Sequence, residues 1–463
     1  MIRRLPLVMG PLLAITSLIA PPPAGLDPEA WRVAGIAAWM ALWWLTAVVP
    51  LEATALIPLV LFPLVGVGSM PATAARYADP VIFLFLGGFL LAAALERWGL
   101  HRRFALHMLR RMGTAAPRVL LGLMLAAAFT SMWVSNTATA VMLLPVALAL
   151  AGSNQRLGGG FALGVAYGAS IGGVATLIGT PPNALLAAAA RELIDREVSF
   201  AGWMPVGLLA AIPLLAGAWW VLRRVFDVQG EVEVPALLSG RLPPLSGGDR
   251  TVLAVFLLTA AAWIFREPKD MGSLRIPGLT DVVPGLTDPG IAVAAGILLM
   301  ALPLRGQRFA TPLDWETARR IPWGVLLLFG GGLALAGAFE TSGLSRAIGG
   351  ALAGLQDVPY PVLLAATIAL FVTLTELTSN TATAALGLPL IVGVANGLGL
   401  PAWPLMVAVA LSCSMAFMLP VATPPNAIAY GSGALTVREM ARAGWRLNML
   451  SVGVILVITL FLS

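Results

Sequence analysis

Residues 131–138 read Ser-Met-Trp-Val-Ser-Asn-Thr-Ala, and residues 375–382 read Thr-Glu-Leu-Thr-Ser-Asn-Thr-Ala. Each stretch interrupts an apolar run with a Ser-Asn-Thr triplet. These residue types are unfavourable inside a helix and favourable at its start, so each triplet predicts a break followed by a new helix. The two triplets recur at a fixed offset, Ser135 against Ser379, which indicates that the chain contains an internal duplication.

Other short motifs repeat at the same offset or within one position of it. Five pairs in the same order predict two halves of common origin. Besides the triplets, the pairs are Gly87-Gly88 with Gly331-Gly332, Glu96 with Glu340, Gly99-Leu100 with Gly343-Leu344, and Thr180-Pro181-Pro182-Asn183 with Thr423-Pro424-Pro425-Asn426.

The composition is that of an integral membrane protein. Of 463 residues, 59% are hydrophobic and only 11% are charged. Soluble domains carry about 25% charged residues. A soluble enzyme, a secreted disulfide scaffold and a disordered protein are therefore excluded. The net charge of +6 comes from arginines between apolar runs, where the positive-inside rule predicts them, and does not indicate a nucleic-acid partner.

Cysteine and histidine usage argues against metal and redox chemistry. The single cysteine, Cys413, lies in an apolar run, which predicts a buried thiol and no internal disulfide. His101 and His107 lie in an arginine-rich stretch, which disfavours a histidine metal site or proton relay across the membrane. Met1–Ala20 has features of a signal peptide, but the many later apolar runs favour a retained first helix.

Two stretches, 117–152 and 359–397, have two apolar arms around a polar triplet. Arms of about 15 residues barely span the hydrocarbon, so we expect two re-entrant hairpins. One long helix with a polar kink is the alternative. The predicted crossings are 5–20, 31–49, 51–67, 80–97, 160–190, 205–226, 250–266, 288–304, 322–341, 402–430 and 443–462, with 160–190 and 402–430 broken at Pro-Pro.

The charge distribution predicts the orientation of these crossings. With the N-terminus inside, twenty basic residues lie on the cytoplasmic side and eight lie outside. The C-terminus is then outside, and the two hairpins enter from opposite sides. The halves are therefore inverted repeats, as in secondary transporters. We predict an N-terminal helix and outer loop over 1–30, a first repeat over 31–226, a cytoplasmic linker over 227–249 and a second repeat over 250–463.

The four motifs suit an anion together with a small cation. Irregular backbone at membrane depth must line a protein cavity, because lipid offers it no hydrogen-bond partner. A helix start carries about half a positive charge and attracts anions. Carbonyl, serine and asparagine oxygens are hard ligands that suit sodium. The motifs contain no Lys, Arg or His, so co-bound cations must help to balance a dianion there.

Glu376 is an ionisable residue in an apolar run, three residues before Ser379. Such residues in membrane segments are candidates for function. Its counterpart in the first half is Met132, so Glu376 lies outside the symmetric site. A structural hydrogen bond to a hairpin neighbour is the alternative. The paired Glu96 and Glu340 lie at predicted helix ends and are interpreted as structural.

Over nearly the whole chain, these motifs resemble those of the divalent anion–sodium symporter (DASS) family of di- and tricarboxylate transporters. The matching stretches are 131–138, 179–183, 375–381 and 418–426. The resemblance implies an all-α polytopic membrane protein with eleven transmembrane helices and two re-entrant hairpins. It also implies a homodimer whose protomers each have a scaffold domain and a transport domain that moves as an elevator.

The resemblance also implies the binding residues. One sodium ion would be held by Ser131, Ser135, Asn136 and Gly179, and another by Thr375, Thr378, Asn380 and Ala422. The substrate carboxylates would meet Asn136, Thr137, Thr180, Asn380, Thr381 and Thr423, with Ser135 and Ser379 supporting the hairpin tips. Some relatives have serine in place of Thr180, so we expect that exchange to change selectivity without abolishing binding.

The leading hypothesis is sodium-coupled uptake of a C4-dicarboxylate such as succinate, malate or fumarate. Sodium is the coupling ion, no organic cofactor is expected, and the protein is expected in the cell inner (plasma) membrane. One alternative is sodium-independent exchange of dicarboxylates or citrate. Another is sodium-coupled transport of a different dianion such as sulfate. An enzyme is disfavoured, because the apolar spans offer no nucleophile pair, metal cluster or carboxylate dyad.

Overall fold

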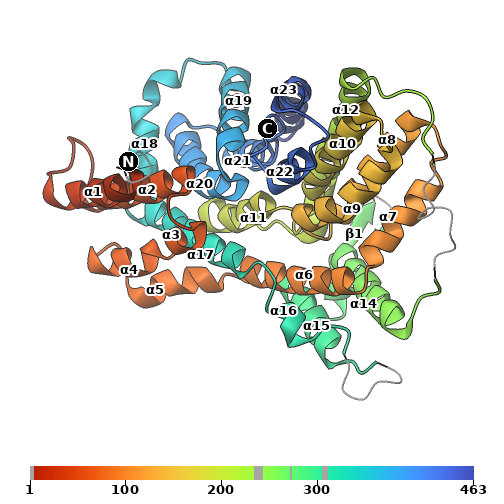
Figure 1. The fold of residues 1–463 in the computed structure, drawn as a ribbon. Helices are drawn as coiled ribbons and strands as arrows, with labels where there is room; N and C mark the ends of the chain where they lie inside the picture. The colour runs from red at the N-terminus through yellow and green to blue at the C-terminus, as the bar shows by residue number, and fades with distance from the viewer. Residues whose placement is uncertain (1–4, 234–242, 272–273, 305–310) are drawn as a thin grey trace.

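The computed structural model describes residues 5–233, 243–271, 274–304 and 311–463, so part of the predicted linker 227–249 lies outside the described residues. Within those ranges the chain is helical (Figure 1) apart from a short antiparallel pair, β1 (Lys269–Met271) and β2 (Leu274–Ile276). This pair was not predicted, because two three-residue strands lack a measurable alternation of apolar and polar residues.

The helices up to residue 225 are α1 (Leu5–Ile19), α2 (Pro28–Thr46), α3 (Leu51–Ala55), α4 (Ile57–Leu64), α5 (Met70–Ala75), η2 (Arg76–Ala78), α6 (Pro80–Arg97), α7 (Leu100–Arg110), α8 (Ala116–Ser131), α9 (Asn136–Ala151), α10 (Gln155–Gly173), α11 (Pro181–Ile194) and α12 (Phe200–Val225). The later ones are α14 (Gly247–Ile264), η3 (Leu279–Asp281), α15 (Asp288–Ala301), α16 (Trp315–Ala318), α17 (Trp323–Thr341), α18 (Leu344–Ala351), η4 (Ala353–Leu355), α19 (Tyr360–Leu377), α20 (Asn380–Leu398), α21 (Ala402–Ser412), α22 (Pro424–Gly431) and α23 (Val437–Phe461).

Seven helical segments of the described chain are long and apolar enough to cross a bilayer by length and composition. They are Met70–Arg97, Phe200–Val225, Gly247–Ile264, Trp323–Thr341, Tyr360–Leu377, Asn380–Leu398 and Val437–Phe461. Helices distant in sequence pack together, such as α12 with α23 and α6 with α15 (Figure 1). The protein is therefore a multi-pass helical membrane protein.

The duplicated sequence motifs have duplicated local structure. Three pairs of helices begin at equivalent positions of the repeated motifs: α7 and α18 at Leu100 and Leu344, α9 and α20 at Asn136 and Asn380, and α11 and α22 at Pro181 and Pro424. Gly99 and Gly343, just before α7 and α18, have φ angles of 63° and 76°. Only glycine adopts this left-handed conformation without strain, which explains why both halves have glycine there.

Each predicted hairpin consists of two helices joined by a few residues. Helices α8 and α9 are joined by residues 132–135, contact each other and both pack on α10. Helices α19 and α20 are joined by residues 378–379, contact each other and both pack on α21. Because the arms contact each other, the chain folds back at each Ser-Asn-Thr triplet and does not continue as one kinked helix.

Helices α8 and α10 approach each other closely because α10 has glycine at the crossing. A methyl group on Gly172 would collide with the carbonyl oxygen of Ala128, and one on Gly168 would lie 2.7 Å from that of Met124. Small residues at such crossings let membrane helices pack by van der Waals contact. This contact holds the first hairpin, α8–α9, against α10. The helix break after α10 therefore lies next to the tip of the hairpin.

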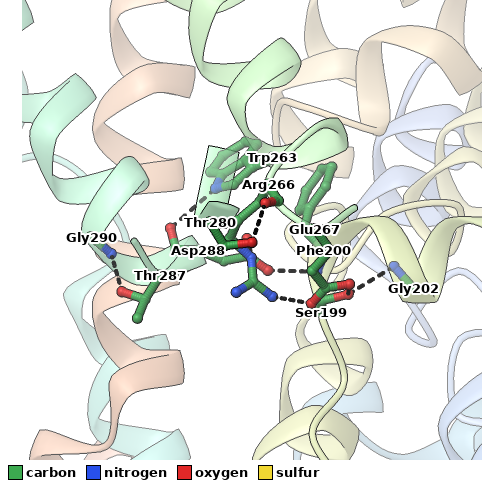
Figure 2. Close-up of polar contacts among 10 residues, drawn as sticks. All are labelled: Ser199, Phe200, Gly202, Trp263, Arg266, Glu267, Thr280, Thr287, Asp288 and Gly290. Carbon is green, nitrogen blue, oxygen red and sulfur yellow. Dashed lines mark hydrogen bonds and ion pairs between the residues drawn. The ribbon is translucent and has the colours of Figure 1, made fainter. Parts of the chain in front are cut away.

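A polar cluster ties the start of α12 to the connection between α14 and α15 (Figure 2). Asp288, which is 6% exposed, accepts a hydrogen bond at Oδ2 from the Phe200 backbone N–H (2.7 Å). Its Oδ1 lies 2.7 Å from Arg266 Nε in an ion pair. Ser199 Oγ donates to Glu267 Oε2 (3.1 Å). The α11–α12 connection is thus fixed at its second end.

Ion pairs also hold the first end of that connection. Arg76 in η2 pairs with Glu192, and Arg191 pairs with Asp79, so the last turn of α11 is tied to the chain before α6. The charge distribution in the sequence assigns Arg76, Arg191 and Arg266 to the same, outer side of the membrane. The ion pairs at one end of the α11–α12 connection and the Asp288 cluster at its other end are consistent with all three arginines lying on one side.

The Asp288 cluster predicts a stability difference between two aspartate substitutions. Asp288→Ala removes one of the two carboxylates that pair with the largely buried Arg266 and leaves the Phe200 N–H without its acceptor, which should cost about 3 kcal/mol. Asp281→Ala removes an exposed ion pair to Arg275 (3.2 Å) and a hydrogen bond from the Gly278 N–H (3.0 Å), so it should cost less, about 1 kcal/mol. Thermal unfolding of both purified variants in detergent measures this difference. Equal melting temperatures would contradict it.

Candidate functional site

The four sequence motifs line a single cavity of about 1060 Å³. Its wall includes residues 135–137, 179–181, 378–381 and 421–425. These stretches come from both halves of the chain and are brought together by the packing of the hairpins on the broken helices. The volume is at the upper end of the range of about 300–1,000 Å³ that is usual for small-molecule pockets.

Four helices begin at this cavity. The first residues of α9, α11, α20 and α22 are Asn136, Pro181, Asn380 and Pro424, and all four line it. The first turn of a helix has N–H groups without intrahelical partners and carries about half a positive charge. Four such ends at one cavity favour an anion without any basic side chain in the motifs.

The residues at the four helix starts differ in how they cap. Ser135 Oγ accepts from the Ala138 N–H (3.1 Å), and Thr423 Oγ1 accepts from the Asn426 N–H (3.3 Å). Ser379 and Thr180 occupy N-cap positions without a side-chain cap bond. The sequence allows the Thr180 hydroxyl to cap its half-helix, as the Thr423 hydroxyl does, but the structure has no such bond at Thr180. The N–H groups at the start of α20 therefore lack a side-chain partner, whereas α11 begins with Pro181 and Pro182, which have no N–H group.

The predicted sodium ligands of the first half lie close together. Ser131 is fully buried behind the cavity and donates a hydrogen bond to Asn136 Oδ1. A methyl group on Gly173 would lie 2.8 Å from Asn136 Oδ1 and 3.0 Å from the Gly179 carbonyl oxygen. Gly173 was not predicted, and its lack of a side chain leaves open the space between these two oxygens. A Gly-Gly pair at 172–173 was its only sequence signal.

The second half repeats this arrangement with a threonine. Thr375 is fully buried, and its Oγ1 lies 2.7 Å from Asn380 Oδ1 and 2.6 Å from the Cys413 carbonyl oxygen. Thr378 Oγ1 lies 2.6 Å from Thr383 Oγ1. In both halves a hydroxyl five residues before the hairpin asparagine contacts the side-chain oxygen of that asparagine. Both asparagines are thereby oriented by their own hairpin.

Asn183 and Asn426, both fully buried, hold the two helix breaks. The Asn183 side-chain amide donates to the carbonyl oxygens of residues 173, 174 and 176 at 2.8–3.3 Å. The Asn426 amide donates to the carbonyls of Ala416 (3.0 Å) and Leu419 (3.1 Å). The sequence motif contained both residues, but their role could not be assigned. They satisfy carbonyls that lose their helical partners where the helix is broken.

The remaining cavity wall comes from α2, α3, α6 and residues 317–325, and much of it is apolar. It also includes Arg97 and Arg320, which the motif survey did not include. Arg97 pairs with Asp314 (2.8 Å), and Arg320 pairs with Glu316 (2.8 Å). Hydrogen bonds from the side chain and backbone of Thr317, together with Arg97, lower the pKa of Asp314, so this carboxylate stays charged beside Arg97.

The chain is similar to known transporters over nearly its whole length. Residues 4–462 match the family model described as the sodium:sulfate symporter transmembrane region. The sodium-dependent dicarboxylate transporter SdcS of Staphylococcus saprophyticus is 38% identical over 98% of this chain and 90% of that protein. SdcS of Staphylococcus aureus is 37% identical with the same coverage.

A solved structure supports the fold. The YdaH transporter of Alcanivorax borkumensis superimposes with a TM-score of 0.59 over 99% of this chain and 96% of that one, at 17% sequence identity. At this identity the match concerns the fold alone. The resemblance to the divalent anion–sodium symporters is confirmed by the family match. The chain therefore belongs to the sodium:sulfate symporter family, which consists of transporters and not of enzymes.

Proposed function

We propose that this protein is a sodium-coupled symporter for C4-dicarboxylates such as succinate, malate or fumarate. The observation that carries the proposal is the convergence of four helix starts on one cavity whose motifs lack basic side chains. The relatives at 37–38% identity are named sodium-dependent dicarboxylate transporters, which supports the choice of substrate and coupling ion.

The proposed substrate site uses the helix starts and the polar side chains beside them. A C4-dicarboxylate carries its two charges on carboxylates that are separated by two carbons, and the cavity has helix starts from both halves to receive them. Ser135, Asn136, Thr137 and Thr180 serve one carboxylate, and Ser379, Asn380, Thr381 and Thr423 serve the other. The partial positive charge at each helix start is spread over its first turn, and α11 and α22 begin with Pro-Pro pairs that have no N–H groups. The four starts therefore balance a dianion only in part, and bound cations complete the neutralisation.

The proposed sodium sites lie beside the two hairpin asparagines. Asn136, Ser131, Ser135 and the Gly179 carbonyl form the first site, and Asn380, Thr375, Thr378 and the Ala422 carbonyl form the second. The support is geometric, since the open space beside Gly173 separates Asn136 Oδ1 from the Gly179 carbonyl. All the proposed ligands are neutral oxygens, which suit a hard monovalent cation.

We propose an elevator mechanism with two inverted repeats, 31–226 and 250–463, after an N-terminal segment 1–30 and joined by a cytoplasmic linker 227–249. The polar substrate ligands all lie on the hairpins and broken helices, whereas the facing wall is largely apolar. A substrate held by one group of elements can move with that group past the other. The proposal also includes eleven crossings, two re-entrant hairpins and a homodimer. It places the protein in the inner membrane, with the N-terminus cytoplasmic and the C-terminus outside.

Sodium coupling predicts the outcome of a gradient experiment. With the purified protein in liposomes, an inward sodium gradient should raise succinate uptake on the order of tenfold over an equal choline gradient. The physical reason is that the motifs contain no basic side chain and the two arginines of the cavity wall, Arg97 and Arg320, are already paired with carboxylates. Radiolabelled succinate measures the rates. Uptake that is indifferent to sodium but requires internal dicarboxylate would instead identify an exchanger. Sodium-dependent uptake of radiolabelled sulfate that succinate does not inhibit would identify a sulfate transporter.

The hairpin asparagines predict a loss of transport. Asn136→Ala and Asn380→Ala each remove an oxygen that is oriented by a buried hydroxyl and proposed to bind sodium and substrate. Losing a hydrogen bond to a charged group costs about 1.5–3 kcal/mol, so uptake should fall at least about tenfold. Asn396→Ala is the matched control, because Asn396 lies exposed on the same helix as Asn380. Normal uptake by either hairpin variant would refute the site assignment.

The close approach of two oxygens to Gly173 predicts that a methyl group added there weakens sodium binding. Gly173→Ala would place a carbon 2.8 Å from Asn136 Oδ1 and 3.0 Å from the Gly179 carbonyl, which should push apart the proposed first sodium site. We expect the sodium concentration for half-maximal uptake to rise on the order of tenfold. Gly453→Ala adds a methyl group with no atom within 4 Å and serves as control. An unchanged sodium requirement in Gly173→Ala would rule out this site.

A further inference from the structure

The two helix breaks differ in length although their motifs match. In the first half the helix ends at Gly173 and resumes at Pro181. In the second half it ends at Ser412 and resumes at Pro424. The paired asparagines bond to equivalent carbonyls, those of residues 173 and 176 in the first half and those of residues 416 and 419 in the second. By this correspondence α21 ends four residues earlier than α10 does.

The earlier end of α21 changes the acceptors of the backbone N–H groups that follow. In the first half, the N–H groups of Val174 and Ala175 donate to carbonyls of the preceding turn, Ile171 and Gly172. At membrane depth an N–H group without an acceptor costs several kcal/mol, and lipid cannot supply one. The corresponding residues of the second half therefore need an acceptor from elsewhere in the protein.

Glu376 is that acceptor. Its Oε1 accepts from the N–H groups of Phe417 (2.7 Å) and Met418 (2.9 Å). Its Oε2 accepts from those of Met418 (3.1 Å) and Leu419 (3.2 Å). One carboxylate thus receives three consecutive backbone N–H groups, a concave arrangement that favours an anionic group. Met132, the counterpart in the first half, has no oxygen that could accept these hydrogen bonds. In that half the helix continues for four more residues, so the corresponding N–H groups find acceptors in the preceding turn.

Glu376 is itself held firmly. The side chain is 5% exposed, and Asn448 Nδ2 on α23 donates to its Oε1 (2.8 Å). The ion pairs found among the described residues do not include it. Tyr167 Oη on α10 donates to the Phe417 carbonyl (2.7 Å). The Phe417 peptide unit is thus held on one side by the second hairpin and on the other by a first-half helix.

The turn held by Glu376 leads directly into the candidate site. The Leu419 carbonyl accepts from the Ala422 N–H (3.2 Å) and from the Asn426 side chain (3.1 Å). Ala422 and Thr423 line the cavity. A change at residues 417–419 therefore moves the Ala422 carbonyl and the start of α22 together.

We propose that Glu376 is a positioning residue that keeps the second helix break unwound and so holds the Ala422 carbonyl at the second sodium site. The inference rests on the proposed sodium coupling. It extends that proposal, because the two sodium sites then differ in the groups that hold their carbonyl ligands. The second site depends on a buried carboxylate outside the repeated motifs, and the first site does not.

The test is the sodium dependence of Glu376→Gln in liposomes. Glutamine keeps the shape, but its NH₂ group faces backbone N–H groups and cannot accept from them. The sodium concentration for half-maximal succinate uptake should rise about tenfold, with a lower Hill coefficient for sodium. Glu340→Gln, on an exposed glutamate of the same half, should leave both values unchanged. A Glu376→Gln protein with the wild-type sodium requirement would overturn the proposal.

Sodium-dependent thermal unfolding separates positioning from a merely structural role. A structural role lowers the melting temperature without sodium but leaves unchanged the sodium concentration that gives half of the stabilisation, and that result overturns the proposal. If Glu376→Gln does not fold, Asn448→Ala keeps the carboxylate and removes one donor that orients it. We expect this variant to raise the sodium midpoint about threefold, and an unchanged midpoint overturns the proposal. Wild-type uptake that ignores sodium would instead refute the coupling itself, and the inference with it.

Discussion

The architecture depends on the hydrogen bonding of backbone that is not helical at membrane depth. Each broken helix leaves carbonyl and N–H groups without partners, and lipid provides none. Asn183 and Asn426 replace the missing donors by presenting their side-chain amides to the carbonyls of the breaks. These two buried amides, together with the Glu376 carboxylate at the second break, stabilise the unwound backbone around which the hairpins and the cavity are arranged.

The same constraint explains why the site uses few charges. A lysine or arginine in the motifs would hold an anion strongly in every state, whereas helix starts and neutral oxygens bind it only in combination with cations. The basic residues of the cavity wall, Arg97 and Arg320, lie outside the motifs, as does the lining residue Glu96, and both arginines already have carboxylate partners in Asp314 and Glu316. The division of the cavity into a polar wall and a largely apolar wall matches a substrate that moves together with one group of helices.

Much of this could be predicted from the sequence because it depends on local signals. The helix starts at Asn136 and Asn380 and the two proline breaks follow from residue preferences that do not need a partner. The roles of Gly173 and Glu376 could not be predicted, because they depend on the approach of atoms from other helices. Thr180 occupies a cap position without making a cap bond for a similar reason: the position follows from sequence, but the rotamer that makes a cap bond is set by packing. The two halves share motifs, yet only the structure reveals that their breaks differ in length.

The ion pairs between η2 and the end of α11 bear on how salt acts on this protein. Their side chains are between 9% and 33% exposed, so mobile ions can reach them. At about 0.15 M salt, charges more than roughly 8 Å apart are already screened, and higher concentrations weaken closer pairs as well. Choline chloride screens as effectively as sodium chloride. If α11 moves with the substrate, ionic strength alone will ease its separation from η2. Sodium chloride would then act on this transporter in two ways. Sodium would bind to specific oxygens, and the salt, like any other, would screen the ion pairs between η2 and the end of α11.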